Sequence, residues 1–240
     1  MLVVFIHGAL NDHRVWAAQS RWFAQHGHEV MALDLPGHGV TAGPALDSVA
    51  TMADWVLATL DTAGVTQAAL VGHSMGALIA LEAAAKAPQR VTHLALLGAT
   101  YPMKVADALL ETARSDEARA IDMVTKWSHS PGYANTEPLR QLMLTMAGKQ
   151  LLHTDLAACN SYAGGDAAAA LVACPTLFIF GANDVMTPPK SASHLSTSIA
   201  NAHTITLTSG HALMTEQPEA VNANLLNFIF GAAVNSSDSR

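Results

Sequence analysis

Residues 68–86 read AALVGHSMGALIALEAAAK, and within this stretch a short apolar run gives way to an alanine-rich helical pattern. The run 68–71 predicts a buried strand, and 77–86 predicts a helix that ends before Pro88. Between them stands Gly72-His73-Ser74-Met75-Gly76, which matches the pattern G-x-S-x-G. A serine in that pattern lies on a tight strand-to-helix turn, where the glycines leave room for neighbouring backbone. The stretch therefore predicts a strand–turn–helix unit that presents the Ser74 hydroxyl.

The same alternation continues on both sides of this stretch. Short apolar runs predict further strands at residues 2–6, 29–33, 91–97, 176–180 and 202–208. Helical patterns alternate with them at residues 16–25, 52–62, 189–198 and 219–230. Such alternation is typical of an α/β domain with a predominantly parallel sheet and helices on both faces.

The alternation is interrupted between residues 101 and 171. No buried strand is predicted there, and helix starts are indicated at Ser115-Asp116-Glu117 and at Thr136-Glu137-Pro138. A segment of this length is too long for a bare loop in a compact domain. We therefore expect an inserted helical cap at 101–171 on a core formed by residues 1–100 and 172–234. The polar tail 235–240 is expected to be flexible.

Composition and charge exclude several classes of function. The chain has 240 residues and a formal net charge of −7, and its 12 Lys and Arg residues form no basic run, so nucleic-acid binding is not expected. No segment approaches the roughly 20 apolar residues of a membrane span. The run 2–6 lacks the length and positive flank of a secretory signal. We expect a soluble cytoplasmic protein, monomer or homodimer, that acts on a small molecule.

Neither the cysteines nor the histidines form a metal motif. Cys159 and Cys174 have no CxxC spacing, so two free thiols are expected rather than a disulfide. The 12 histidines include no HExxH or similar helical pair, and a turn around Gly27 accounts for His26 and His28. We therefore predict no metal site.

A serine hydroxyl is a poor nucleophile at neutral pH, so Ser74 needs a base and an acid beside it. With this motif the chain order is Ser, acid, His. His211 follows the last predicted strand, where a loop can bring it over Ser74, and Asp184 follows the strand 176–180, where it can hold the imidazole. A chance pattern match, a surface histidine and an exposed turn aspartate are the alternatives. Asp34 fits the acid role less well because it ends an earlier strand.

Acyl transfer also needs hydrogen-bond donors for the developing oxyanion. The first predicted donor is the backbone N–H of Met75, directly after the nucleophile. The second is the N–H of Ala9, in the loop that follows the first strand, where Gly8 permits close backbone approach. His7 is expected to bond loop backbone rather than to carry protons.

Together these motifs resemble the α/β-hydrolase superfamily, and the bacterial carboxylesterase and lactonase-like branch within it. The resemblance spans most of the chain outside the cap, and it is carried by His7-Gly8, Asp34-Leu35-Pro36-Gly37-His38-Gly39, the turn at Ser74, Asp184 with Thr187-Pro188-Pro189, and Gly210-His211 with Glu216-Gln217-Pro218. Membership implies a Ser-Asp-His triad, a helical cap and no cofactor. The stretch from Asp34 to Gly39 is expected to support the edge of the site.

One departure from the family pattern concerns the first strand. Many members carry an antiparallel hairpin before the strand that leads into His-Gly, whereas the first predicted strand here begins at Leu2. We therefore expect an α/β-hydrolase fold without that hairpin, with about six strands in the sheet. In this respect the chain is similar to the plant esterase and hydroxynitrile-lyase group, whose lyases use similar triads for a different reaction.

Two interpretations apply to the apolar side chains of the cap, and one of them is an adaptable hydrophobic binding pocket. Methionine fills irregular apolar space, and Met103, Met123, Met143 and Met146 fall in the cap together with Trp127. Ordinary packing between cap helices is the alternative for each of them.

The sequence thus predicts a serine hydrolase that cleaves a small carboxylic ester, lactone or thioester through an acyl-enzyme on Ser74. Lyase or perhydrolase chemistry at the same triad, or a ligand receptor on the same scaffold, are the alternatives.

Overall fold

Six parallel strands form one sheet, in the order β2-β1-β3-β4-β5-β6, in the computed structural model, which describes residues 1–234. The strands are β1 (Leu2–Ile6), β2 (Val30–Ala32), β3 (Ala68–His73), β4 (Val91–Leu97), β5 (Thr176–Gly181) and β6 (Ala202–Leu207). Every neighbouring pair is parallel, and residues 1–234 contain no antiparallel hairpin. The predicted fold class is therefore confirmed. The tail 235–240, predicted to be flexible, lies outside the described residues.

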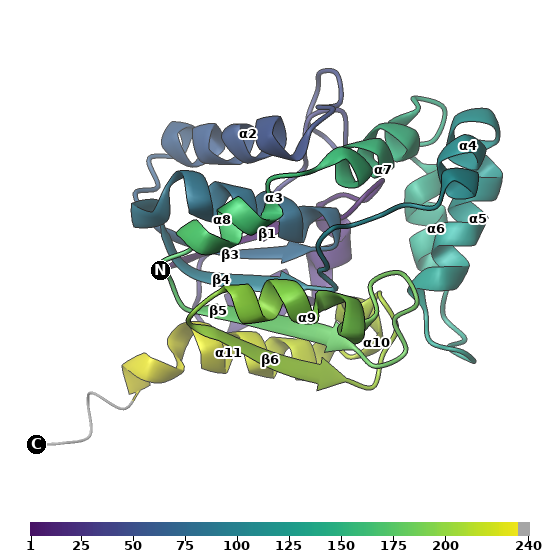
Figure 1. Ribbon diagram of the computed structural model, residues 1–240. Coiled ribbons are helices and arrows are strands. Elements are labelled where there is room, and N and C mark those ends of the chain that lie inside the picture. Colours follow the sequence, from purple (N-terminus) through teal and green to yellow (C-terminus); the bar gives the residue numbers. More distant parts are fainter. Residues whose placement is uncertain (235–240) are drawn as a thin grey trace, which may run out of the picture.

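Helices cover both faces of this sheet (Figure 1). One face carries α2 (Val49–Thr62), α3 (Met75–Lys86), α8 (Gly165–Leu171) and α9 (Pro189–Ser198). The other face carries α1 (Ala17–Gln25), α10 (Leu213–Glu216) and α11 (Pro218–Val234), with the 3-10 turn η1 (His13–Trp16). A second 3-10 turn, η2 (Pro88–Arg90), leads into β4.

The central strands are buried on both faces because each helical layer contributes its own hydrophobic core. In β1, Val4 and Ile6 belong to the core beneath α2 and α3, whereas Val3 and Phe5 belong to the core beneath α1 and α11. Successive side chains of a strand point to opposite faces, so a continuous apolar run fills both cores at once.

The segment between β4 and β5 folds into helices and contains no strand. These helices are α4 (Asp107–Ser115), α5 (Glu117–Ser128), α6 (Glu137–Leu144), α7 (Leu151–Ser161) and α8. The first three lie beyond the arrowheads of the strands in Figure 1. Helices α4 to α7 share a hydrophobic cluster of their own. Helix α8 instead packs against α3 and α9, because its alanines fit closely on the outer layer of the core.

Candidate active site

Ser74 occupies the turn between β3 and α3 in a strained backbone conformation. Its φ of 54° and ψ of −117° lie where a non-glycine residue costs about 1–3 kcal/mol. The flanking glycines are required, since a Cβ on Gly72 would overlap the carbonyl of Gly76, and a Cβ on Gly76 would overlap that of Ile6. The Ser74 amide donates to the Leu97 carbonyl at 2.9 Å. The turn therefore holds the Ser74 side chain at the C-terminal edge of the sheet and at the N-terminus of a helix.

His211 and Asp184 form a buried pair at the same edge. His211 Nδ1 lies 2.7 Å from Asp184 Oδ2, and both side chains are almost inaccessible to solvent. The amides of Met186 and Thr187 each donate to Asp184 Oδ1 at 2.8 Å, and the Thr187 hydroxyl donates to Oδ2 at 2.7 Å. An ionised carboxylate held by these donors accepts a hydrogen bond from the Nδ1–H of His211, and this leaves Nε2 unprotonated and able to act as a base.

The charge of Asp184 is stabilised by its partners. Burial acts to raise the pKa of Asp184, but the His211 charge, the His211 hydrogen bond and the Thr187 donors outweigh it and hold that pKa well below its ordinary value. Asp184 therefore remains ionised throughout the neutral range and can stabilise an imidazolium at His211.

Two residues that the sequence analysis did not assign to the site fix the position of His211. His73 Nε2 donates to the His211 carbonyl at 2.9 Å, and burial lowers the pKa of His73 to about 3, so this ring stays neutral. Gly98 adopts a φ of +55°, and a Cβ there would lie 3.0 Å from His211 Nδ1. Thr187, noted only as part of a motif, is a third positioning group. Their roles depend on contacts between distant segments, which local sequence patterns do not report.

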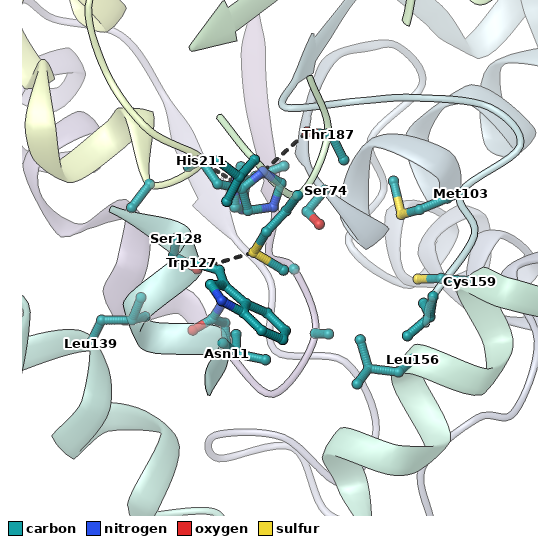
Figure 2. A pocket seen from close by; sticks show the side chains of 18 of the residues that line it. Asn11, Ser74, Met103, Trp127, Ser128, Leu139, Leu156, Cys159, Thr187 and His211 are labelled. Atoms are coloured by element: carbon teal, nitrogen blue, oxygen red, sulfur yellow. Dashed lines mark hydrogen bonds between the residues drawn. The ribbon is translucent and has the colours of Figure 1, made fainter. Parts of the chain in front are cut away.

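Ser74 and His211 both line a cavity of about 400 Å³ between the sheet edge and the inserted helices. Figure 2 shows the two labelled side chains close together, with Trp127, Leu139 and Leu156 on the opposite side of the cavity. No hydrogen bond joins Ser74 to His211 within the described residues, and such contacts often tighten only when substrate binds. The fold thus brings the predicted nucleophile, base and acid to one place.

The two predicted oxyanion donors lie beside Ser74. Ala9 lines the cavity, and the Gly8 backbone approaches so closely that a Cβ there would lie 3.3 Å from Ser74 Cβ. Met75 is the first residue of α3. Within residues 1–234, neither the Ala9 amide nor the Met75 amide has a protein acceptor. Both N–H groups are therefore free to bind an oxyanion.

Most of the remaining wall of the cavity is apolar, although the polar side chains of Asn11, Ser128, Thr187 and Thr215 also line it. Inserted segments contribute its main lining residues, namely Met103, Val105, Leu109, Val124, Trp127, Leu139, Met143 and Leu156. Of the four cap methionines, Met103 and Met143 line the cavity, whereas Met123 and Met146 pack within the cluster of α4 to α7. Lys104, which is exposed, is the sole Lys, Arg, Asp or Glu among the lining residues of the described chain.

The loops around the site bear out two further expectations. His7 Nδ1 donates to the Gly8 carbonyl at 2.8 Å, and its Nε2 accepts from the Leu35 amide at 3.1 Å. Burial lowers the pKa of His7 to about 4, so His7 is a neutral, structural residue. Asp34 accepts from the His13 amide and from the Val40 amide, at 2.7 and 2.9 Å, and so holds the supporting turn together.

The cluster of possible metal ligands and the two cysteines, both outside the triad, already have protein partners or are buried. Asp12, His13 and Asp34 bring ligand-type atoms within 4.8 Å of one another, but Arg14 forms an ion pair with Asp12 at 2.6 Å. His13 Nδ1 lies 2.9 Å from Asp34. The cysteines Cys159 and Cys174 are free and buried, as expected. No helix within residues 1–234 has the length and apolar character needed to cross a bilayer.

Comparison with known proteins identifies sequence relatives of this chain. A putative carbamate hydrolase, RutD, from Klebsiella pneumoniae is 29% identical over 239 residues, which cover 93% of this chain and 89% of that protein. The (E)-2-((N-methylformamido)methylene)succinate hydrolase of Acinetobacter baylyi is 26% identical over 207 residues, which cover 83% of this chain and 77% of that protein. Both relatives are hydrolases by name, in agreement with the predicted class of enzyme.

The fold is shared with solved structures as well. The enol-lactonase from Burkholderia xenovorans LB400 matches with a TM-score of 0.85 over 95% of this chain and 90% of its own, at 22% identity. A protein-family model, described as alpha/beta hydrolase fold, matches residues 2–126 of this chain. Because that match covers more than half of the chain, and because the sheet has the expected parallel order, the chain belongs to the α/β-hydrolase fold family.

Proposed function

We propose that the protein is a serine hydrolase that cleaves a small, uncharged and largely apolar carboxylic ester, lactone or thioester. The observation that carries this proposal is the buried Asp184–His211 pair, which lines one cavity with Ser74 on its strained turn. Hydrolysis is the activity that the family and the relatives support, and esterases and an enol-lactonase share the fold. The acyl-enzyme step and the substrate class are our inferences from the site.

In the proposed reaction, His211 Nε2 removes the Ser74 proton as Oγ attacks the substrate carbonyl carbon. The Ala9 and Met75 amides donate to the oxyanion, and Asp184 stabilises the imidazolium. His211 then gives the proton to the leaving oxygen or sulfur, which leaves an acyl group on Ser74. Water attacks that acyl group with His211 again as base, and the acid and free Ser74 are released.

The lining of the cavity favours an uncharged substrate. A succinate derivative, the substrate class named for the Acinetobacter baylyi relative, carries carboxylates that would need cationic partners. Here Lys104, an exposed residue, alone offers a permanent positive charge among the described lining residues. Most of the other lining side chains are apolar, so an aliphatic or aromatic acyl group fits the cavity better.

A fluorophosphonate probe tests the nucleophile. Wild-type protein should be labelled at Ser74, and Ser74→Ala should not be labelled, because only an activated serine displaces fluoride from the probe to form a phosphonate ester. Ser193→Ala, which changes an exposed serine on α9, should be labelled like the wild type. Labelling of Ser74→Ala at the wild-type rate would contradict the proposal.

A panel of p-nitrophenyl esters with lengthening acyl chains, with lactones and thioesters beside them, tests the substrate class. We expect kcat/KM to rise with chain length until the cavity is filled. Turnover of cyanohydrins, or peroxide-dependent halogenation, in preference to every ester would favour the lyase or perhydrolase alternative. Tight binding with a single slow turnover would favour the receptor.

A further inference from the structure

Asp155 is a fully buried acid on α7, and it joins that helix to two loops of the core. Its Oδ2 accepts from the Leu10 amide at 2.8 Å and lies 2.9 Å from His38 Nε2. His38 Nδ1 lies 3.1 Å from the Pro36 carbonyl, so both ring nitrogens face acceptors and both carry protons. Burial acts against the charged ring, but the hydrogen bond and charge of Asp155 raise the pKa of His38 above its ordinary value. The contact is therefore a buried ion pair that also holds a backbone amide.

Leu10 depends on the inserted helices in two ways. Its φ of +47° is a left-handed conformation, which costs a branched residue about 1–2 kcal/mol. Its side chain is fully buried in the hydrophobic cluster of α4 to α7, and its N–H is bound by Asp155. The strained conformation therefore persists because residues from α4 to α7 hold both the side chain and the amide of Leu10.

Leu10 directly follows Ala9, whose N–H is the oxyanion donor in the proposed reaction. The peptide plane that Asp155 holds is therefore the plane next to that donor. The two planes meet at the Ala9 Cα, so fixing the Leu10 amide restricts the φ and ψ angles of Ala9 that set the direction of its N–H. Asp155 itself is not among the residues that line the cavity. We propose that Asp155 is a positioning residue for the oxyanion hole, which fixes the Leu10 amide and thereby aims the Ala9 N–H at the reacting oxygen. This inference rests on the proposed function.

The test compares kcat and KM for p-nitrophenyl butyrate in wild type and in Asp155→Ala. Removal of the acceptor should lower kcat by about 100-fold and leave KM within about threefold, because an oxyanion donor acts mainly in the transition state. Asp155→Asn keeps an oxygen acceptor in the same place. Its kcat should therefore be at least about tenfold higher than the kcat of Asp155→Ala.

Leu152→Ala is the matched control, since Leu152 lies on the same helix in the same cluster and does not line the cavity. It should lower the thermal midpoint while kcat stays within about threefold of wild type. An Asp155→Ala enzyme with wild-type kcat, a kcat loss no larger than that of Leu152→Ala, or an Asp155→Asn enzyme no better than Asp155→Ala would each overturn the inference.

Two further outcomes are distinguishable. A wild type that neither hydrolyses the ester nor takes up the fluorophosphonate contradicts the proposed function and this inference with it. If Asp155→Ala fails to fold, amide hydrogen exchange of the wild type decides. The Leu10 amide should exchange at least about 1000-fold more slowly than an exposed loop amide, and exchange at the exposed rate would overturn the inference.

Discussion

At the scale of single residues, the proposed site depends on short-range geometry around His211. Asp184 fixes one ring nitrogen, His73 holds the backbone carbonyl, and Gly98 leaves the space that the ring occupies. None of these three groups is the nucleophile, yet each determines whether Nε2 can reach Ser74. Substitutions at these positions should therefore lower kcat more than they raise KM.

Asp184→Asn should lower kcat by a factor on the order of 10³–10⁴, because an amide no longer stabilises the imidazolium or selects the tautomer. Steady-state kinetics on the preferred ester measure this loss. Asp47→Asn, at an exposed loop position, is the control and should match the wild type. We take about threefold as the limit of non-specific effects on kcat. A kcat for Asp184→Asn within that limit of the wild-type value would exclude Asp184 as the acid of the triad.

Gly98→Ala should lower kcat by about tenfold or more, since the added Cβ would push the His211 ring from its place. Gly64→Ala is matched for backbone strain, because Gly64 has a φ of +68° and nothing within 4 Å of the added Cβ. Both variants should lose stability in urea unfolding through backbone strain, Gly98→Ala more because its Cβ also contacts His211, and only Gly98→Ala should lose activity. Equal kcat in the two would show that His211 does not need this space.

At the scale of elements, hydrogen bonds tie the His211 loop to the C-terminal end of α5. The Ala212 amide donates to the Ser128 carbonyl at 2.7 Å. Glu216 on α10 accepts from the Gly210 amide at 3.1 Å, and from the Ser130 amide and hydroxyl at 2.8 and 2.6 Å. The inserted helices therefore contact the proposed machinery both here and at Asp155, so they do more than cover the cavity.

Glu216→Gln should loosen this junction, because the amide group offers one acceptor oxygen where the carboxylate offers two. We expect a loss of about 1 kcal/mol in the free energy of unfolding, a lower kcat, and faster amide exchange at Gly210 and Ser130. Glu219→Gln, at an exposed position in the first turn of α11, should change none of these. An unchanged rate of amide exchange at Gly210 would show that Glu216 does not hold the His211 loop to the C-terminal end of α5.

At the scale of the whole molecule, buried neutral histidines link stability to pH. The folded-state pKa values of His7 and His73 are about 4 and about 3, against an ordinary value of 6.5. Below pH 6.5 the unfolded chain takes up protons that the folded chain does not, so this contribution to stability is complete above 6.5 and is lost as pH falls toward the folded values. His38, whose pKa is raised, acts in the opposite direction as pH rises.

The free energy of unfolding should therefore fall between about pH 6.5 and about pH 4, by roughly 1.4 kcal/mol for each pH unit and each of the two histidines. Urea unfolding of the wild type across this range measures the slope. His203→Gln, which removes an exposed histidine on β6, should show the same slope as the wild type. A stability that does not change with pH in this window would mean that His7 and His73 take up protons in the folded state.

The strand–helix order and the identity of the triad candidates could be predicted from the sequence alone. Apolar runs such as 2–6 and 91–97 coincide with strands because burial on both faces demands continuous apolar residues. Ser74, Asp184 and His211 could be named because each stands just after a strand, and the C-terminal ends of parallel strands meet at one edge. The loop donor Ala9 was assigned for the same reason.

The contacts that hold those groups in place could not be predicted from the sequence, because they join residues that are far apart along the chain. Asp155 lies 145 residues from Leu10 in sequence, and Glu216 lies 86 residues from Ser130. Such contacts produce no periodic pattern in the sequence. A buried aspartate on a helix cannot be distinguished from an exposed one by sequence alone, because the difference lies in neighbours that are distant along the chain. The same reason explains why α8, expected in the cap, packs on the core, and why Met123 and Met146 lie away from the cavity. Local patterns specify the elements, and the packing of distant side chains specifies the site.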